Sequence, residues 1–593
     1  MPANYPPGQS PPPDQEPDRT IAYRPQNGPS HPQGHPQQGG YPQQPPGGYQ
    51  QQPYGQQGQP GQPQQGYQQQ QPYGQQPAYG QQPAYGQQSY GQQPGWQQQG
   101  PDFLGSGQPP APPTRKGGKG WLIAVIAAVV VALVGGGGAY AVSLLSGGGT
   151  QPHDVLPGSA IGYVRLDLDP AANQKLALFG IARKFTATKD SFRGEDPRTA
   201  LFDLLNKNAD TKINYATDVE PWLGSRIGVA VLPPAKGSEE PGFVGAIQVT
   251  DADKAKAGIA KIADGDKYGI AFREDYALIA ATQAEVDQAA QAAPLADLPT
   301  FSDDLSALGE TGVLSFWMDA GRVAQLAPQM AAQDPAALAQ IKNVRVAGAL
   351  RFDEGYVELA GISRGAKALE GMGEPEATGI GKLPASTVGA VSFSGLGDVV
   401  GKQWAQILKS ADQAAGGGLQ QFADQAQQQA GLALPADLVT LLGKNLTLAV
   451  DGTGLDSGQP KIGARIVTDP AKAQEVVGKI EKLLAGDGTG TGIPPIAKVP
   501  GDGTLVLASS QEYAAALAKD DGGLADDESF QLAIPDAGNV TAAAYVDLNK
   551  IEKLYLQNVR GEARTNLQQL RAVGISGTQS GGDASFSLRV LFD

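Results

Sequence analysis

The sequence has no cysteine and only three histidines, His31, His35 and His153. Without cysteine the chain forms no disulfide, has no thiol nucleophile and offers no thiolate to a metal. Because no histidine follows residue 153, most of the chain also lacks the commonest general base and metal ligand. Catalytic Ser–His–Asp and Cys–His arrangements are therefore excluded from that part.

Aliphatic residues are scarce in the first 120 residues, where Gln, Pro, Gly and Tyr dominate. Such a segment cannot bury enough apolar surface to offset the entropy of ordering, so we expect residues 1–120 to be disordered. The repeat YGQQ starts at Tyr54, Tyr73, Tyr79, Tyr85 and Tyr90. It allows two interpretations, a segment that clusters or binds cytoplasmic partners and a solvated spacer.

Positive charge is in short supply in the remainder of the chain. The first 120 residues carry five basic and four acidic side chains, and the whole chain has a net charge of −15. The rest therefore carries −16. An acidic globular region repels phosphate backbones, which argues against nucleic acid as a partner.

Residues 121–145, WLIAVIAAVVVALVGGGGAYAVSLL, contain no charged side chain. This length is enough to cross a bilayer as a helix. The basic run TRKGGKG precedes it, so the positive-inside rule predicts a cytoplasmic N-terminus and an extracytoplasmic C-terminal region at the plasma membrane. The alternative is a signal peptide cleaved near Ala139-Tyr-Ala141, but the preceding tail of 120 residues is wrong for one.

The region after a short linker, 146–153, contains an internal sequence repeat. The phrase IQVTDADKAKAGIAKI at 247–262 returns as RIVTDPAKAQEVVGKI at 465–480. Four further pairs, such as LPGSAIGYV with LPASTVGAV, follow in the same order with separations of 218 to 229 residues. We expect two tandem copies of one unit, 154–368 and 380–593, joined by a linker at 369–379.

The repeated phrase is predicted to be scaffold, because its apolar residues have helical spacing and its aspartate stands where a helix begins. Asp251 and Asp469 are the expected N-caps, and Pro470 suits the first helical position. The same junction of strand, aspartate and helix is predicted at Asp169, Asp319 and Asp547. Thr282 with Glu285, and Ser509 with Glu512, are predicted to form capping boxes.

Strands alternate with helices in each copy, and DEG at 353–355 predicts a hairpin. The fold class is therefore α+β, with a mixed or antiparallel sheet and helices in each unit. The predicted strands of the first copy are Ile161–Leu166, Ile227–Leu232, Phe243–Val249, Gly269–Arg273, Gly312–Trp317, Val344–Phe352 and Tyr356–Ile362.

No motif selects a catalytic, cofactor-binding or metal-binding residue. The glycine-rich Gly486–Gly492 lacks the Lys-Ser/Thr ending of a phosphate loop. Asp451 and Asp456 miss the spacing of a calcium loop, so we expect a turn between strands. The amphipathic stretch Gly401–Gly431, with Trp404 and Phe422, is either a helix pair packed on the sheet or a cover over an apolar groove.

These segments resemble a family of bacterial membrane-anchored proteins, domain-of-unknown-function family 3352 of high-GC Gram-positive bacteria. The resemblance rests on LPGSAIGYVRLDLDPAANQKLALFGIARKF, VEPWLGSRIGVAVLP, the VTDADKA junction and LADLPTF. It implies a single anchor and an extracytoplasmic location, and it supplies no activity or catalytic residue. The second copy has FSGLGDVV in place of LDLDPAAN, so its first helix need not begin in the same way.

The function we predict is non-enzymatic binding or scaffolding at the cell envelope, without cofactor or metal. Protein partners on either side of the membrane are compatible with it. One alternative is a carrier or sensor of an apolar ligand such as a lipid, for which we expect a large apolar pocket. A second is a carboxylate-dependent hydrolase of an envelope polymer, for which two carboxylates must face each other across an open cleft.

Overall fold

The computed structural model describes residues 149–189, 198–199, 202, 213–238, 240–326, 335–370, 373–414, 418–455, 457–486, 496–519 and 522–593. In these ranges no helix is both long and apolar enough to span a bilayer. The predicted tail, 1–120, and the predicted span, 121–145, lie outside the described residues.

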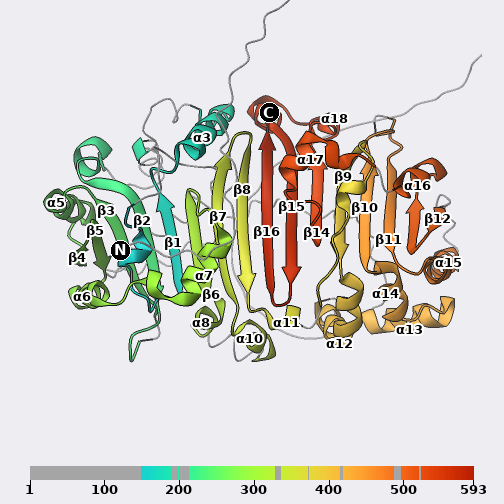
Figure 1. Cartoon of the computed structure of the whole chain (residues 1–593), viewed down its shortest axis with the longest axis horizontal. Helices are drawn as coiled ribbons and strands as arrows, with labels where there is room; N and C mark the ends of the chain where they lie inside the picture. The colour runs from blue at the N-terminus through green and yellow to red at the C-terminus, as the bar shows by residue number, and fades with distance from the viewer. Residues whose placement is uncertain are drawn as a thin grey trace, which may run out of the picture. The chain divides into compact units, whose positions relative to one another are not determined.

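Sixteen strands form one sheet, and every neighbouring pair is antiparallel (Figure 1). The α+β prediction is confirmed, and of its two options the sheet is antiparallel rather than mixed. The first eight strands are β1 (Gly162–Asp167), β2 (Leu223–Leu232), β3 (Gly242–Val249), β4 (Gly269–Arg273), β5 (Tyr276–Ala280), β6 (Leu314–Asp319), β7 (Arg345–Asp353) and β8 (Tyr356–Arg364). The other eight are β9 (Thr387–Ser394), β10 (Asn445–Asp451), β11 (Lys461–Val467), β12 (Ala497–Gly501), β13 (Thr504–Ala508), β14 (Ala542–Asp547), β15 (Leu570–Ser580) and β16 (Asp583–Phe592).

The strand order is the same in the two halves of the sheet. The full order is β12-β13-β11-β10-β9-β14-β15-β16-β8-β7-β6-β1-β2-β3-β5-β4. The strands of each half can be numbered one to eight in chain order. Read from the outer edge inward, both halves then have the order fourth, fifth, third, second, first, sixth, seventh and eighth. The halves meet at their eighth strands, where β8 pairs with β16 from Tyr356–Leu591 to Ser363–Ala584.

Helices and short turns of helix lie on both sides of the sheet. In the first half they are α2 (Pro152–Val155), α3 (Ala172–Lys184), the π-turn η1 (Tyr215–Val219), α5 (Ala252–Ala263), α6 (Gln283–Gln291), η2 (Leu295–Asp297), α7 (Pro299–Leu308), α8 (Ala320–Ala324), α10 (Pro335–Ile341) and α11 (Lys367–Glu370). In the second they are η3 (Ile380–Lys382), α12 (Leu396–Ala414), α13 (Leu419–Ala430), α14 (Ala436–Leu442), α15 (Pro470–Gly486), α16 (Gln511–Leu517), η4 (Leu524–Asp526), α17 (Glu528–Ala533), α18 (Glu552–Tyr555) and α19 (Gly561–Leu567).

Aspartate capping explains where the helices of the repeated phrase begin. The Asp251 carboxylate accepts a bond from the Lys254 amide at 3.0 Å, and that of Asp469 accepts bonds from Ala471 and Lys472. Asp319 accepts from the amide of Arg322 in the same way, at the start of α8. These predictions are confirmed, as is the capping box of Thr282 and Glu285.

Three capping predictions are wrong. Asp547 accepts a bond from the Lys550 amide within a turn, but α18 begins only at Glu552, with Ile551 as its N-cap. After β1 the chain continues for two residues beyond Asp169, and the helix begins at Ala172 with Ala171 as its N-cap. In the second half the N-cap is Ser510, whose hydroxyl accepts from the Tyr513 amide. The box predicted for Ser509 and Glu512 does not form, because the Ser509 hydroxyl accepts instead from the Ile462 amide on β11.

The predicted strands of the first half are found to within two residues at most ends, including the β7–β8 hairpin. One prediction starts early. Gly312 has a φ of +59° and a Cβ on it would lie 2.1 Å from the Leu350 carbonyl oxygen, so it makes a tight turn before β6 begins at Leu314.

Candidate apolar binding site

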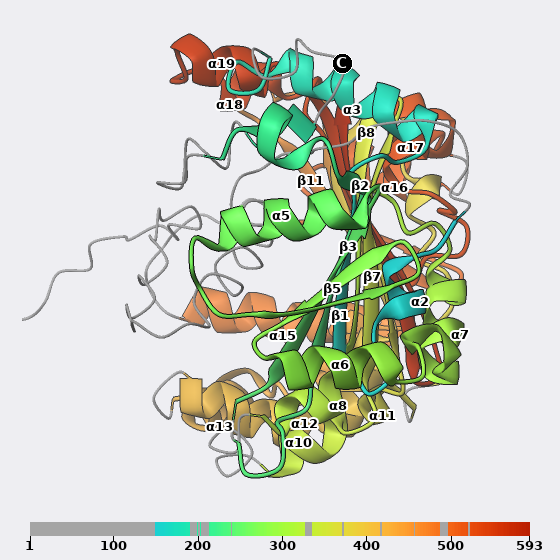
Figure 2. The same cartoon turned by 90° about the vertical axis from the view of Figure 1, so that its left-hand side faces the viewer.

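The two faces of the sheet carry opposite chemistry. Successive residues of a strand point to opposite faces, and residues paired across strands point to the same one. Arg165, Glu358 and Arg589 therefore share one face, here called the charged face, and Val164, Phe316 and Phe586 share the other, the apolar face. Figure 2 shows α2 and α7 on one side of the sheet and α5, α13 and α15 on the other.

Apolar residues fill two rows that cross the eight central strands from β1 to β9. The first row is Val164, Phe316, Gly348, Gly361, Phe586, Gly577, Ala542 and Phe393. The second is Leu166, Leu314, Leu350, Leu359, Leu588, Ile575, Ala544 and Val391. Among the described strands, Lys498 on the edge strand β12 is the one charged residue whose register places it on this face.

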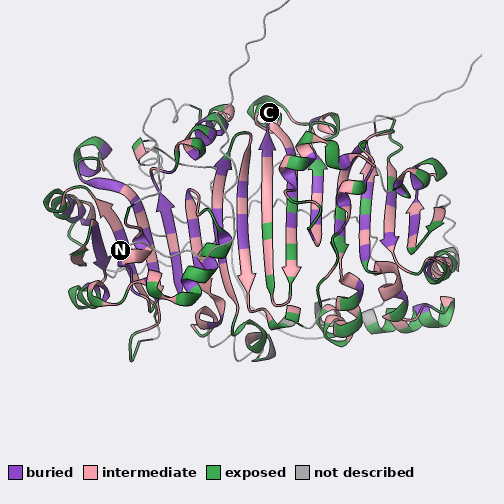
Figure 3. Ribbon diagram, viewed as in Figure 1, coloured by how far each residue is buried: buried purple, intermediate pink, exposed green. Residues whose placement is uncertain are grey.

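Much of the apolar face is open. Eight large apolar side chains on its described strands are 37% to 52% exposed: Phe272, Val391, Phe393, Leu448, Ile462, Val546, Ile575 and Phe586. Figure 3 shows the resulting alternation of buried and exposed residues along β14 and β15. Soluble proteins rarely expose contiguous apolar patches of this kind unless something binds there. An antiparallel sheet with one face toward water normally has polar residues on that face.

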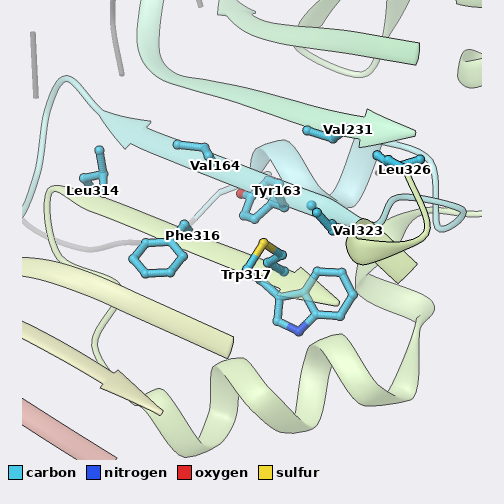
Figure 4. Close-up of a pocket in the computed structure, with 10 residues that line it drawn as sticks. Tyr163, Val164, Val231, Leu314, Phe316, Trp317, Val323 and Leu326 are labelled. Carbon is cyan, nitrogen blue, oxygen red and sulfur yellow. The ribbon is translucent and has the colours of Figure 1, made fainter. Parts of the chain in front are cut away.

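In the first half the apolar face is hollowed into a pocket of about 380 Å³ (Figure 4). Ligand sites occupy roughly 300–1,000 Å³ and are lined mainly by apolar side chains. Leu314, Phe316 and Val164 come from neighbouring strands, and Val323 and Leu326 from α8 and the turn after it. Gly162, Tyr163, Val231, Trp317 and Met318 complete the lining. The rings of Tyr163 and Trp317 belong to the charged face, where Trp317 donates to Asp304.

Two phenylalanine rings lie over glycines where the halves meet. A Cβ on Gly348 would lie 2.6 Å from the Phe316 ring, and one on Gly361 would lie 2.2 Å from the ring of Phe586. Because these two glycines pair with each other, the floor of the apolar face has no side chain of its own at that point. The rings take the space that Cβ atoms would fill and shield the backbone of β7 and β8.

Helices line the apolar face at the ends of the strands. In the first half α3, η1 and α5 pack on it through a cluster that includes Leu178, Val219 and Ile259. In the second half α13 and α15 pack together through Ala426 and Val476, and α15 reaches the sheet through Val477 and Leu505. The middle of the face is left between these two sets of helices.

An aspartate–lysine pair fastens corresponding helices in both halves. Lys261 of α5 contacts Asp218 of η1 at 2.6 Å, and Lys479 of α15 contacts Asp437 of α14 at 3.0 Å. The bond from Lys261, followed by those from Thr217 and Asn214, lowers the pKa of Asp218. A second pocket, about 300 Å³ in volume and partly polar, lies beside the first pair between η1 and α5. The sequence analysis missed both pairs, although their separations of 219 and 218 residues match the repeat.

The charged face is neutralised by ion pairs. Glu358 is 5% exposed and accepts bonds from Arg351 at 3.0 Å, Arg589 at 2.9 Å and Ser587 at 2.7 Å. Burial acts to raise the pKa of Glu358, but the Ser587 bond and the two arginines outweigh it, so the pKa is lowered. Asp304 of α7 likewise holds Arg345 through two bonds and accepts from Trp317.

His153 is half-buried against the charged face beside the start of the described chain. Its ring lies 5.3 Å from the Phe301 ring, and its Nδ1 lies 3.3 Å from the Tyr163 hydroxyl. Burial lowers the pKa of His153, and Arg165 adds to the effect while Asp154 opposes it. The described residues contain no group of three or more His, Asp or Glu side chains placed to hold a metal.

The remaining residues singled out in the sequence have structural surroundings or lie outside the description. Asp451 is buried at the end of β10, where it accepts bonds from Ser386 and Thr453. The turn predicted between β10 and β11 is present, while Asp456 is not among the described residues. Of the glycine-rich Gly486–Gly492, only Gly486 is described, as the last residue of α15.

The amphipathic stretch Gly401–Gly431 falls on α12 and α13. Its prediction as a helix pair is confirmed, but α13 packs chiefly on α15 and α12 chiefly on α14 rather than on the sheet. Phe422 of α13 is 53% exposed. The pair thus extends the helical border of the apolar face in the second half.

Comparison with known proteins gives one family and one solved structure. Residues 124–276, about a quarter of the chain, match the sequence model of a family described as protein of unknown function (DUF3352). No curated protein matches. A structure titled "Structure of crystal form III of TP0453" is 8% identical over 36% of this chain and 80% of that chain, with a TM-score of 0.17. A likeness at that score supports no statement about fold or function.

Proposed function

We propose that this protein binds an apolar molecule, such as a lipid, on the apolar face of its sheet and catalyses no reaction. The observation that carries the proposal is the uncharged surface formed by the two rows, part of it a pocket of about 380 Å³ and part of it open. Transfer of a hydrocarbon from water to such a surface yields about 25 cal/mol per Å² of apolar area removed from water.

The location we propose follows from the sequence. The uncharged run at 121–145 anchors the protein in the plasma membrane, with residues 1–120 in the cytoplasm and the sheet outside. The match over 124–276 begins within this run and supports membership of the DUF3352 family. An anchored protein with an apolar surface is suited to hold lipid close to the bilayer or in the envelope.

We also propose that the sheet arose by tandem duplication of one eight-strand unit. The identical strand order of the two halves supports this, as do the corresponding Asp218–Lys261 and Asp437–Lys479 pairs. Duplication explains why the halves meet through their eighth strands, since a unit with one open apolar face and one open edge can extend both by pairing with a copy of itself.

Among the alternatives, the structure gives least support to a hydrolase. The buried carboxylates Asp304, Glu358 and Asp451 each accept several hydrogen bonds on the charged face, so none of them is left facing an open cleft. Scaffolding through proteins remains the competing function, because an apolar surface also suits a protein partner. In the proposed function the apolar face contacts a lipid, and in the competing function it contacts a protein.

Photo-crosslinking of the full-length protein in membrane vesicles tests the proposal. A fatty acid with a terminal diazirine is irradiated with the vesicles, and labelled peptides are identified by mass spectrometry. We expect label on the peptides of β6, β15 and β16, because their apolar-face residues line the surface. Ile575→Asp should lower the labelling of the β15 and β16 peptides about tenfold, since a carboxylate there must lose water when the ligand binds.

Thr578→Asp is the matched control. Thr578 lies on the same strand, β15, but on the charged face, and it is exposed. This variant should label like the wild type. Equal labelling of the β15 and β16 peptides in the wild type, Ile575→Asp and Thr578→Asp would contradict the proposal and favour a protein partner.

A further inference from the structure

The apolar face continues without interruption from one half of the sheet into the other. Both rows cross the β8–β16 pair, Gly361 meeting Phe586 in the first and Leu359 meeting Leu588 in the second. Neither row changes chemistry at this seam. The pocket in the first half and the exposed residues of the second half therefore belong to one surface.

Two aromatic rings over glycines form the floor of this surface at the seam. Gly348 and Gly361 have no side chains, and the rings of Phe316 and Phe586 lie over them. On the strands next to the seam, Ile575 is 48% exposed and Phe586 is 39% exposed. Both side chains are accessible from the middle of the face, so the seam forms no barrier between the halves.

The length of the surface sets the size of molecule that fills it. Val164 on β1 and Phe393 on β9 are the ends of the first row, with six strands between them. At a strand spacing of about 4.8 Å, the seven spacings amount to about 34 Å. This distance is greater than the length of an extended stearoyl chain.

The chemistry of the floor favours hydrocarbon over an extended peptide. The eight central strands, which run from β1 to β9 across the sheet, are each paired on both sides. Their backbone N–H and C=O groups are therefore already bonded. With no polar side chain in either row, a peptide lying there would leave its own backbone groups unsatisfied, which a hydrocarbon chain does not.

A second copy of the chain is a poorer occupant. Two sheets packed face to face lie about 10 Å apart. Helices such as α5 and α15 are attached to this face and are about 10 Å thick themselves. They project from the side on which a second sheet would have to approach (Figure 2).

We propose that the two halves form a single site, in which one long hydrocarbon chain lies across the strands from the Val164 pocket, over the seam, toward Phe393 and Val391. This inference rests on the proposed function and adds to it the class of ligand, a lipid with a linear chain longer than those of ordinary phospholipids. It also assigns Phe316 and Phe586 to the contact surface at the middle of the chain.

The test compares two chain lengths on the full-length protein in vesicles. Caprate and melissate, each with a terminal diazirine, serve as the short and long probes, and labelling of the β6 peptide reports occupancy of the pocket. In the wild type we expect both to label. Ile575 lies five strand spacings from Val164 across the sheet, within reach of the long probe but not of the short one. Ile575→Asp should therefore lower melissate labelling about tenfold and leave caprate labelling unchanged. Thr578→Asp should change neither.

Three outcomes decide the matter. Loss of melissate labelling alone supports the single site. If both probes label the β6 peptide equally in the wild type and in Ile575→Asp, the halves bind separately and the inference is wrong while the proposed function stands. If neither probe labels the wild type, the proposed function and the inference fail together.

Discussion

The charged face and the apolar face of the same sheet differ in how the polarity of their side chains relates to exposure. On the charged face, arginines and carboxylates are buried beneath helices, and each group whose contacts are described above is neutralised by a partner, as Glu358 is by Arg351 and Arg589. On the apolar face the strands carry almost no charge, yet seven large side chains of the second half remain more than a third exposed. Polarity and exposure are thus inverted relative to an ordinary solvated sheet.

This inversion separates stability from binding. Buried ion pairs fix the register of strands and helices on the charged face, because a misplaced strand would leave a charge without its partner. The middle of the apolar face has no such ion pairs. Its apolar side chains remain exposed after folding and are available to a ligand. Substitutions on the first face should therefore change the free energy of unfolding, and those on the second should change ligand binding.

The largest effect is expected from Glu358→Ala, which leaves Arg351 and Arg589 without their shared partner on the charged face. We expect the free energy of unfolding to fall by about 3 kcal/mol or more, measured by urea denaturation of the full-length protein. Ile575→Asp is the comparison on the apolar face, with an expected change within about 0.5 kcal/mol. Similar losses for the two variants would remove the distinction between the faces.

The Glu358 carboxylate should also make stability depend on pH. Its pKa is lowered in the folded state, so its contribution is present above the unfolded pKa of about 4.3 and is lost as the pH falls through the folded value. In Glu358→Gln this loss should be absent. Unfolding free energies measured from pH 6 downward would show the two proteins converging.

Gly361→Ala tests the floor of the apolar face, because its Cβ would lie 2.2 Å from the Phe586 ring. The ring must move, and we expect a loss of about 1–3 kcal/mol. Gly389→Ala is the control, on the same face with its nearest contact at 3.7 Å. A stability of Gly361→Ala equal to that of Gly389→Ala would show that the ring is not held over the glycine.

His153 offers a smaller test of the charged face. Because burial lowers its folded pKa, the folded state resists protonation and stability falls as the pH drops below about 6.5, the unfolded value. The variant His153→Phe should lose this dependence between pH 7 and 5.5, where carboxylates contribute little. Thermal unfolding at several pH values in that window provides the measurement.

The smallest difference is expected between the two lysine pairs that fasten helices along the apolar face. The Lys479 side chain is 26% exposed and that of Lys261 is 66% exposed. Lys479→Met should lower the free energy of unfolding by about 1 kcal/mol, and Lys261→Met should lower it less, because water screens the more exposed pair. A reversed order would mean that exposure does not set the strength of these pairs.

The sequence predicts local structure well because local structure depends on local chemistry. Asp251, Asp319 and Asp469 stand where helices need an N-cap, and apolar spacing locates the strands of the first half. The repeat predicts that similar strands recur. Asp169 and Asp547 are the exceptions, since each follows a strand and resembles a cap, but the next helix begins only at Ala172 and at Glu552.

The residues of the candidate site could not be predicted from local sequence patterns. Each strand alternates, and alternation shows that two faces differ without showing which of them helices will cover. Arg165 and Glu358 resemble solvent-facing residues in the sequence, yet both are buried. Arg165 donates to Thr311 and Glu358 accepts from Ser587, and both of these partners are far away in the chain. The apolar pocket depends on the register of β1, β2 and β6, which are separated by long stretches of chain. The apolar-ligand alternative was stated from the sequence, but no residue could be assigned to it.

The pairing of β8 with β16 also governs the order in which the protein can be built. Tyr356 and Leu591 are neighbours in the sheet but more than two hundred residues apart in the chain, and closing so long a loop is slow and entropically costly. Until β16 emerges from the ribosome, β8 is an open edge beside a bare apolar surface, which is a template for aggregation. During synthesis this edge therefore needs protection by a chaperone or by the membrane.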